Sequence, residues 1–422
     1  MASVIVLILV ISLLAVDGTE NSSENTLRMV LASEILAKIQ MGEPVEYDHV
    51  IVKGDLDLSG LCLPVKHINR TIFEIEFIDL TETLNVIASP IKISDSVFDG
   101  FVSFGNAVFT EINFHGSNFT KNADFKGVTF SGEFDLGSAT FTKDADFRRA
   151  TFSGNDLFQE AMADFSKAIF RGYADFNGAI FSENAGFECA TFSEDADFSN
   201  AIFNKIAVFK GATFGRDAAF IGATFSRDAN FQEAAFSGDT NFRKAMFNAK
   251  TNFIGSRFSK YFFGWTDVKN KFYCDEAAYL SLIKNFKDNG QFNDADDCYY
   301  QYRFTKMFSN IQYDVPGFIS DVLSLIIFGY GVKLMMTFFL ALFIIFIFGL
   351  WFSKDMDGDL LKALSMSVIT ILSLPSDWLG SEKSQYSGFI SEHIKSATLE
   401  RLIGWSLLII LVNTLSRLMI RY

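Results

Sequence analysis

The sequence predicts a mainly-β solenoid with four sides, followed by a helical hairpin and an α-helical membrane domain with two spans. Three observations predict it. The chain of 422 residues holds 49 Phe, most of them at regular spacing between Phe98 and Phe263. The segment after this array changes to a helix–turn–helix pattern. The runs Leu334–Phe352 and Leu402–Ile420 are almost free of charge and long enough to cross a bilayer.

Phe occupies every registered position from Phe165 to Phe258, in steps that alternate between five and six residues. The residue two places before each Phe is Ala, except at Thr240, Thr251 and Ser256. An apolar period of eleven residues can indicate a right-handed helical supercoil. On a helix, however, steps of five and six residues rotate by about 140° and 240° and separate the Phe side chains. The units also contain Gly and Thr, which are poor helix formers.

A β-solenoid explains the same pattern. Each stretch of five or six residues forms one side of a coil, with its Ala and its Phe pointing inward. The Phe rings then stack from coil to coil, and the backbones pair about 4.8 Å apart. Four sides of five and six residues in alternation make a coil of 22 residues. We expect seven to eight coils between Phe98 and Phe262, or roughly 35 Å.

The unit Ala-(Asp/Asn)-Phe-x-x resembles that of the pentapeptide-repeat proteins, Ala-(Asp/Asn)-(Leu/Phe)-x-x. The resemblance spans residues 98–265 and implies a right-handed quadrilateral β-helix. The chain departs from the family pattern by an extra residue after every second unit, which predicts enlarged alternate corners. The register also breaks at Asn155–Met162, which we interpret as a bulged corner loop.

The acidic side chains of the array allow two interpretations. Some soluble pentapeptide-repeat proteins mimic DNA with acidic ladders, and this chain has outward Asp124, Asp146, Asp164, Asp175 and Asp197. The favoured interpretation is structural: these are the Asp/Asn that the fold places beside its inward Phe. The net charge of −14 argues against a nucleic-acid partner bound through its phosphates. A structural or sensing domain is therefore expected.

The N-terminus carries a short apolar stretch, Val4–Val16, which fits a signal peptide or signal anchor over residues 1–18. No Lys or Arg precedes it. Export would make the repeat domain extracytoplasmic. Residues 19–97 resemble the irregular coil that caps such solenoids, and a short helix at Leu27–Gln40 is expected to cover the open end.

Residues 270–310 resemble a single tetratricopeptide-like hairpin, with Tyr279, Leu282 and Phe286 on one helix and a turn at Gly290. One hairpin is not an array, so a spacer between solenoid and membrane is the favoured interpretation. Residues 316–332 predict an interfacial helix. A disulfide between Cys274 and Cys298 is not expected, because helical geometry places them roughly 12 Å apart.

Nothing in the sequence indicates catalysis, a cofactor or a metal site. No nucleophile–base pair, phosphate-binding loop or metal-ligand spacing is present, so an enzyme is not expected. Asp355–Asp359 has the start of a Ca²⁺ loop but lacks its later Gly and Glu, which indicates a solvated turn.

Residues 333–422 contain a span, a short apolar helix with a polar loop at 360–378, and a second span. This order resembles the pore module of two-helix ion channels of the potassium-channel superfamily. The resemblance implies a pore helix at Ala363–Leu372, an inner helix at Leu399–Ile420 with a hinge at Gly404, and tetrameric assembly. The pore-lining candidates that it implies are Thr370, Ser373, Leu374, Pro375, Ser376 and Asp377.

The chain departs from that family at the filter. The family motif is Thr-Val-Gly-Tyr-Gly followed by Asp, and only Asp377 matches, so potassium selectivity is not expected. Phe328-Gly329-Tyr330-Gly331 precedes the first span and predicts a juxtamembrane turn. An exported solenoid would also place loop 360–378 in the cytoplasm, in weak agreement with its Lys and Arg. Two-helix channels have their pore loop on the outer side of the membrane. Either the export prediction is therefore false or the resemblance to channels is loose.

Two hypotheses remain for a multi-pass protein of the cell membrane. The first is an ion channel or pore, a homo-oligomer whose solenoid forms a vestibule or gating domain. The second is a non-conducting surface protein whose solenoid binds a protein or a cell-envelope component.

Overall fold

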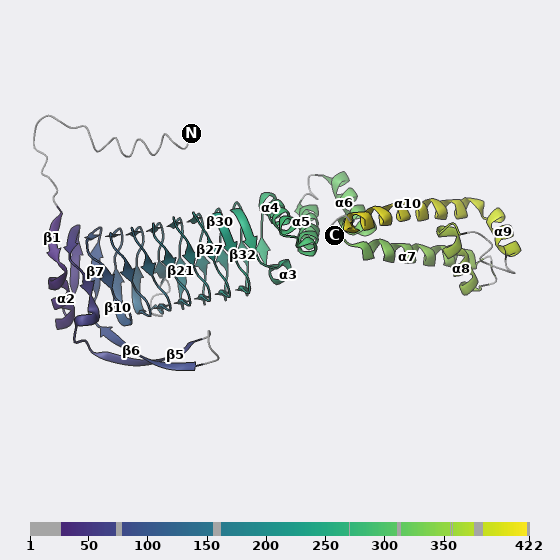
Figure 1. Ribbon diagram of the computed structural model, residues 1–422. Coiled ribbons are helices and arrows are strands. Elements are labelled where there is room, and N and C mark those ends of the chain that lie inside the picture. The colour runs from purple at the N-terminus through teal and green to yellow at the C-terminus, as the bar shows by residue number, and fades with distance from the viewer. Residues whose placement is uncertain are drawn as a thin grey trace, which may run out of the picture.

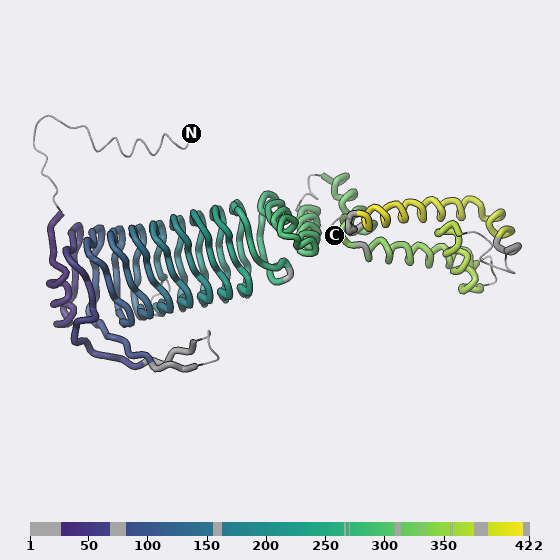
Figure 2. Tube along the Cα trace, viewed as in Figure 1, coloured from purple at the N-terminus to yellow at the C-terminus, as the bar shows by residue number. Residues whose placement is uncertain are grey.

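The computed structural model describes residues 27–72, 78–154, 162–269, 271–309, 314–354, 356, 358–374 and 383–419. The chain forms an elongated molecule with a parallel β-solenoid of about ten turns at one end. A helical hairpin follows, and then two long helices with a short helix beside them (Figure 1). The tube in Figure 2 shows the coils stacked in chain order along one axis.

The strands of successive coils pair in parallel, in four columns that form the four sides. Column 1 contains β1 (Arg28–Leu31), β3 (Val50–Lys53), β8 (Val97–Phe98), β11 (Asn118–Phe119), β14 (Thr140–Phe141), β18 (Ile169–Phe170), β22 (Thr191–Phe192), β26 (Thr213–Phe214), and the first parts of β30 (Ala235–Asn241) and β33 (Arg257–Phe262). Column 2 contains β4 (Leu56–Asp57), β9 (Val102–Ser103), β12 (Ala123–Asp124), β15 (Ala145–Asp146), β19 (Ala174–Asp175), β23 (Ala196–Asp197), β27 (Ala218–Ala219), and the ends of β30 and β33.

The other two columns complete each coil. Column 3 contains the end of β6 (Ile78–Ile87), β10 (Ala107–Asn113), β13 (Thr129–Asp135), β16 (Thr151–Phe152), β20 (Ile180–Phe181), β24 (Ile202–Phe203), β28 (Thr224–Phe225) and β31 (Met246–Phe247). Column 4 contains β2 (Val45–Asp48), β7 (Ile91–Ser94), the ends of β10 and β13, β17 (Met162–Asp164), β21 (Asn184–Gly186), β25 (Ala207–Val208), β29 (Ala229–Asn230), β32 (Thr251–Asn252) and β34 (Phe272–Tyr273).

The coil length of 22 residues is confirmed, because Asn118 pairs with Thr140 and Ala123 with Ala145. One coil is longer. Thr140 pairs with Ile169, a step of 169 − 140 = 29 residues, which is seven more than the regular coil. The predicted bulge at Asn155–Met162 falls almost wholly on residues 155–161, which lie outside the described part of the chain. The columns realign beyond it.

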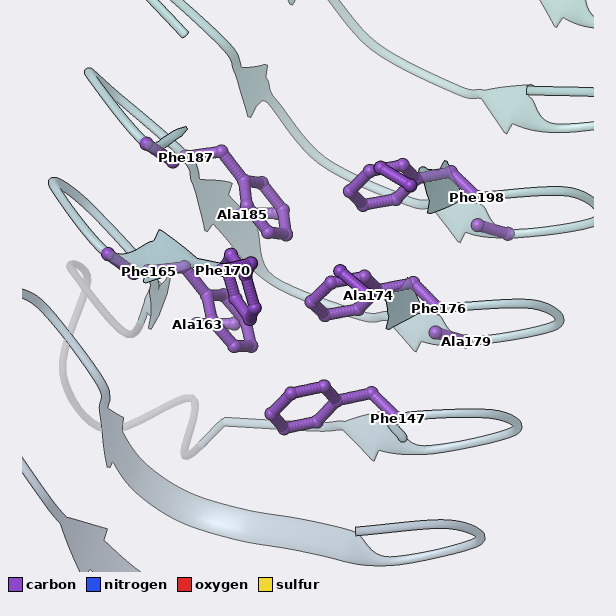
Figure 3. Close-up of a cluster of buried hydrophobic side chains, with 14 of the residues drawn as sticks. Phe147, Ala163, Phe165, Phe170, Ala174, Phe176, Ala179, Ala185, Phe187 and Phe198 are labelled. Carbon is purple, nitrogen blue, oxygen red and sulfur yellow. The ribbon is translucent and has the colours of Figure 1, made fainter. Parts of the chain in front are cut away.

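The interior is a stack of aromatic rings. Phe187 is fully buried, and its ring stacks parallel to those of Phe165 and Phe209 in the neighbouring coils, at centroid distances of 4.8 and 4.9 Å. Phe176 and Phe198 meet Phe187 edge-on. Figure 3 shows these columns of rings pointing into the coil, with Ala side chains between them. Offset stacks and edge contacts are favourable aromatic geometries, so one residue type can fill the whole core.

The outward Asp and Asn stabilise the corners, which supports the structural interpretation of the acidic ladder. In the five-residue corners, Phe125 C=O accepts from Val128 N–H, and Gly127 between them has φ +65°. The Asp before the Phe closes the same corner. Asp124 Oδ1 accepts from Lys126 N–H at 2.8 Å, and equivalent bonds form at Asp146, Asp164, Asp175, Asp197 and Asn230. This is the Asx turn, which satisfies a backbone donor locally.

Asp175 gives the solenoid a pH dependence. Burial, together with the neighbouring Asp197 and Asp146, raises the pKa of Asp175 from 3.8 to about 6. Because the folded-state pKa is the higher one, the contribution of Asp175 to stability is greatest below about pH 4 and is lost as the pH rises through about 6. Asp175→Asn keeps the turn acceptor, as Asn230 does, and removes the charge. We expect it to raise stability at pH 7 by about 1 kcal/mol, after a discount for solvent screening at this partly exposed group.

Thermal unfolding followed by circular dichroism from pH 3 to pH 8 would test this expectation. The two proteins should melt together near pH 3, where Asp175 is protonated in both folded and unfolded states, and should separate towards pH 7. A parallel shift at every pH would mean that the gain is unrelated to ionisation.

The N-terminal prediction was wrong in two details. The helix expected at Leu27–Gln40 is α2, Ala32–Met41, and the residues before it form strand β1, which pairs with β3. The solenoid therefore has about ten turns rather than seven to eight, since the region expected only to cap it already forms coils. Val52, Leu56 and Ile91 fill these coils in place of Phe. The antiparallel hairpin of β5 (Val65–Ile72) and β6 was not expected; it extends along one side of the solenoid (Figure 1).

The C-terminal end of the solenoid is covered by α3 (Trp265–Val268) and the hairpin of α4 (Glu276–Asp288) and α5 (Phe292–Ser309). The side-chain amide of Asn285 accepts from Tyr261 N–H at 3.1 Å and donates to Tyr261 C=O at 3.0 Å. Asn285 thus makes both bonds that a further strand would make. The hairpin, expected as a spacer, is also the cap of the last coil. Cys274 and Cys298 are both free thiols.

Helix α6 (Val315–Phe328) and the turn η2 (Gly329–Gly331) connect this cap to the long helices. The turn predicted at Phe328–Gly331 is confirmed, with φ of +51° at Gly329 and +56° at Tyr330. Arg303 on α5 forms an ion pair with Asp321 on α6 and lies 5.1 Å from the Tyr330 ring centre. Lys333 pairs with Asp297. The solenoid cap is therefore bonded to the start of the first long helix.

Candidate functional site

Two helices are long and apolar enough to cross a membrane. They are α7 (Leu334–Ser353) and α10 (Ile394–Met419), and their most apolar windows, Met335–Ser353 and Ile394–Ser416, have mean hydropathies of 2.5 and 1.4. Only 17% and 22% of these windows is buried. A core helix of a soluble protein would be mostly buried, so the exposed apolar surface of α7 and α10 is consistent with a membrane-associated repeat protein.

The short helix α8 (Leu360–Ile371) lies against both long helices, at the end of α7 remote from the solenoid (Figure 1). It begins after Gly358, and the Asp359 side chain caps it by accepting from Lys362 N–H at 3.1 Å. Its buried side includes Ala363, Met366 and Thr370, at helical spacing. Twelve residues span about 18 Å, which is too short for a hydrocarbon layer of about 30 Å.

Two glycines allow α8 to approach its neighbours closely. A Cβ on Gly349 of α7 would lie 2.5 Å from Leu364 Cδ2, and a Cβ on Gly404 of α10 would lie 2.1 Å from the carbonyl oxygen of Ile371. The second contact is with backbone, which cannot turn aside as a side chain can. Small residues are the usual means of close helix packing within membranes.

The α8–α10 contact encloses a polar pair. Ser367 on α8 and Glu400 on α10 are both fully buried, and the Ser367 hydroxyl donates to Glu400 Oε1. The other carboxyl oxygen, Oε2, has no hydrogen-bond partner among the described residues. A buried acid in an apolar helical bundle is costly and therefore marks a candidate functional position.

Three of the six pore-lining candidates are among the described residues, and these three lie near this contact. Thr370 is fully buried, and its hydroxyl donates to Met366 C=O at 2.8 Å. Ser373 follows the end of α8 with φ +51°, and its Oγ accepts from the Trp405 indole N–H at 3.1 Å. Leu374 packs against the apolar cluster around Phe348 and Met366. Pro375, Ser376 and Asp377 lie outside the described residues. Gly404, the hinge candidate, lies in the packed α8–α10 contact.

Sequence reasoning missed Ser367 and Glu400. Glu400 and Arg401 stand just before the apolar run Leu402–Ile420. In the sequence, Glu400 therefore resembles the charged residues that commonly flank the end of a span. A usable signal was present: Ala397, Glu400 and Gly404 share one helix face, and two of these three are small. An acid among small residues indicates a face turned towards protein rather than lipid.

One group of potential metal ligands is present in the described part of the chain. Asp48, His49 and Asp95 bring their ligand atoms within 4.8 Å of one another, and all three are exposed. His49 Nδ1 is already hydrogen-bonded to Asp48 at 2.8 Å. Nothing else at this corner points to an ion, so we assign no metal site to it.

The repeat array defines the class of the protein, a β-solenoid with an inward Phe on each side of the coil. Residues 90–129, 114–162, 165–213 and 209–257 match the family model described as "Pentapeptide repeats (9 copies)". These stretches of the solenoid therefore consist of pentapeptide repeats. No curated protein and no solved structure matched the chain. The matched residues do not include α7, α8 or α10.

Proposed function

We propose that this protein is an oligomeric membrane pore of the two-helix type, with its solenoid and loop 360–378 on opposite sides of the bilayer. In this proposal α7 and α10 cross the membrane and α8 enters it without crossing. The position of α8 is the observation that carries the proposal, because α8 packs against both candidate spans although it is too short to cross the hydrocarbon layer itself.

The details of α8 support this function. It is too short to span, it is held between two candidate spans at glycine contacts, and its C-terminal end leads into the polar segment Ser373–Asp377. Short helices that end in a polar loop bring backbone carbonyls to a pore axis in ion channels. Ser373–Asp377 contains no Gly, so we propose a pore without the potassium filter.

The alternative is a non-conducting surface protein whose solenoid binds a protein or a cell-envelope component. The absent filter glycines favour it. The solenoid presents stacked Asp and Asn columns and ten turns of side-chain ladders, a surface suited to an extended partner. In this alternative α8 is an interfacial helix that stabilises the anchor.

Single-channel recording of the purified full-length protein in planar bilayers tests the pore. We expect currents, and a change of ion preference in Asp377→Asn, because removing a carboxylate near the path weakens cation selection. Asp228→Asn in the solenoid makes the same charge change far from α8 and should leave the currents as they were. Silence from folded protein across ions and voltages would overturn the pore and favour the surface-binding alternative.

A further inference from the structure

Helix α10 has three faces that differ in environment. One face is buried against α7 and α8 and contains Ala397, Glu400, Gly404, Leu407 and Thr414. A second is exposed and wholly apolar, formed by Trp405, Leu408, Val412 and Leu415. This composition suits contact with lipid chains.

The third face, which we call the α10 seam, is exposed but mixed in character. Its residues follow one another at alternating steps of three and four: Leu399, Leu402, Ser406, Ile409, Asn413 and Ser416. This is the heptad spacing by which helices pack side by side. Asn413 is nine residues after Gly404, which is about 900° of helical rotation, or half a turn beyond two full turns. The seam therefore points directly away from α7 and α8.

Asn413 makes contact between the seam and lipid chains unfavourable. Its side chain is exposed and has no hydrogen-bond partner within the described residues. It lies within the apolar window Ile394–Ser416, one helical turn before Arg417. Hydrocarbon cannot satisfy an amide, and each unsatisfied polar group there costs several kcal/mol.

A second copy of this chain can satisfy it. A carboxamide both donates and accepts, so the Asn413 side chains of two copies related by symmetry are complementary to each other. Ser406 and Ser416 are small enough to let two backbones approach, while Leu402 and Ile409 supply apolar contact between them. Ser406 already donates to Leu402 C=O at 2.8 Å, so its hydroxyl brings no unpaired donor to the contact.

We infer that the α10 seam is the self-association surface of the protein: α10 of one copy packs along α10 of the next, with Asn413 paired between copies. The back of α10 meanwhile stays on α7 and α8. This inference rests on the membrane placement in the proposed function but does not require conduction.

Cysteine cross-linking in phosphatidylcholine vesicles tests the seam. In a background with exposed Cys62 and Cys189 changed to Ser, Ile409→Cys should form disulfide-linked copies on oxidation. Leu408→Cys is the matched control, because it lies one residue away and is 46% exposed on the lipid face, against 66% for Ile409. Equal cross-linking at both positions, or none at Ile409→Cys, would overturn the seam.

A second variant measures the amide. Asn413→Leu should weaken association in detergent micelles by roughly three- to thirty-fold for each pair of amides lost. Val412→Leu on the lipid face should leave the association constant unchanged. An Asn413→Leu protein that assembles as tightly as the parent would count against pairing. Copies that cross-link but never conduct would overturn the pore proposal and support the seam. Currents without cross-links would support the pore and overturn the seam.

Discussion

Replacing Gly404 with Ala should destabilise the packing of α8 on α10 by about 3 kcal/mol, the upper end of the usual cost of overpacking. The added methyl would lie 2.1 Å from the Ile371 carbonyl oxygen, and a backbone atom cannot move without moving α8. Elsewhere in a helix the same change is favourable by about 1 kcal/mol, because Ala is the better helix former. Destabilisation by Gly404→Ala would therefore indicate the close contact with Ile371, whereas stabilisation would indicate that it is absent.

Gly388→Ala is the matched control for Gly404→Ala. Gly388 is exposed on helix α9 (Lys383–Glu392), and nothing lies within 4 Å of the position that a Cβ would take there. Thermal unfolding of the full-length protein in detergent, followed by Trp fluorescence, would compare the two. Trp405 is bonded to Ser373 across the same contact and should report its loss. If Gly404→Ala were as stable as Gly388→Ala, the close approach of Gly404 to the Ile371 carbonyl oxygen would not be needed for the packing of α8 on α10.

Replacing Phe187 with Ala should destabilise the solenoid by about 3–5 kcal/mol. Phe187 is fully buried, and its ring contacts six others, two by stacking, three edge-on and one at a tilt. Ala leaves a cavity that neighbouring coils cannot close, since each is held to the next by its backbone ladder. Because a solenoid is stabilised by contacts between adjacent coils, the loss should begin locally.

Guanidinium unfolding of the full-length protein, followed by far-UV circular dichroism, would measure this loss. Phe187→Leu is the control for size: it keeps most of the volume and should cost far less than the Ala variant. Hydrogen exchange should show faster opening in the coils next to residue 187 and little change near β1. A uniform increase over all coils would mean that the solenoid opens as one unit.

The sequence predicted the regular part of the fold because one residue type marks it. A Phe at each registered position defines both the inward direction and the coil length, and the pairing of Asn118 with Thr140 follows from that count. The first coils lack the regularly spaced Phe. Val52 and Leu56 point inward there, and aliphatic residues at such spacing also fit ordinary strands, so the coil count was too low.

The helical part was predicted less completely, because hydropathy locates a span but not its faces. The order of α7, α8 and α10 followed from the apolar runs. The pairing of Ser367 with Glu400 did not, since it joins residues 33 apart across two helices. Gly404 was identified, but its contact with Ile371 depends on how α8 is oriented. The seam on α10 likewise became visible only when the buried face of the helix was known.

The amide of Asn285 limits the length of the molecule. A β-solenoid with an open last rung offers its backbone to any similar edge, and copies could then join end to end into a fibre. Asn285 occupies that edge at Tyr261, and Asn289 and Gln291 donate to the carbonyl oxygens of Tyr261 and Phe263, so a further strand cannot pair with this column. Duplication of a repeat can still lengthen the solenoid. An added stretch of 22 residues forms one more coil, or about 4.8 Å, without altering either end. The number of repeats in the chain therefore sets the length of the solenoid, and its capped C-terminal end prevents a second copy from extending it.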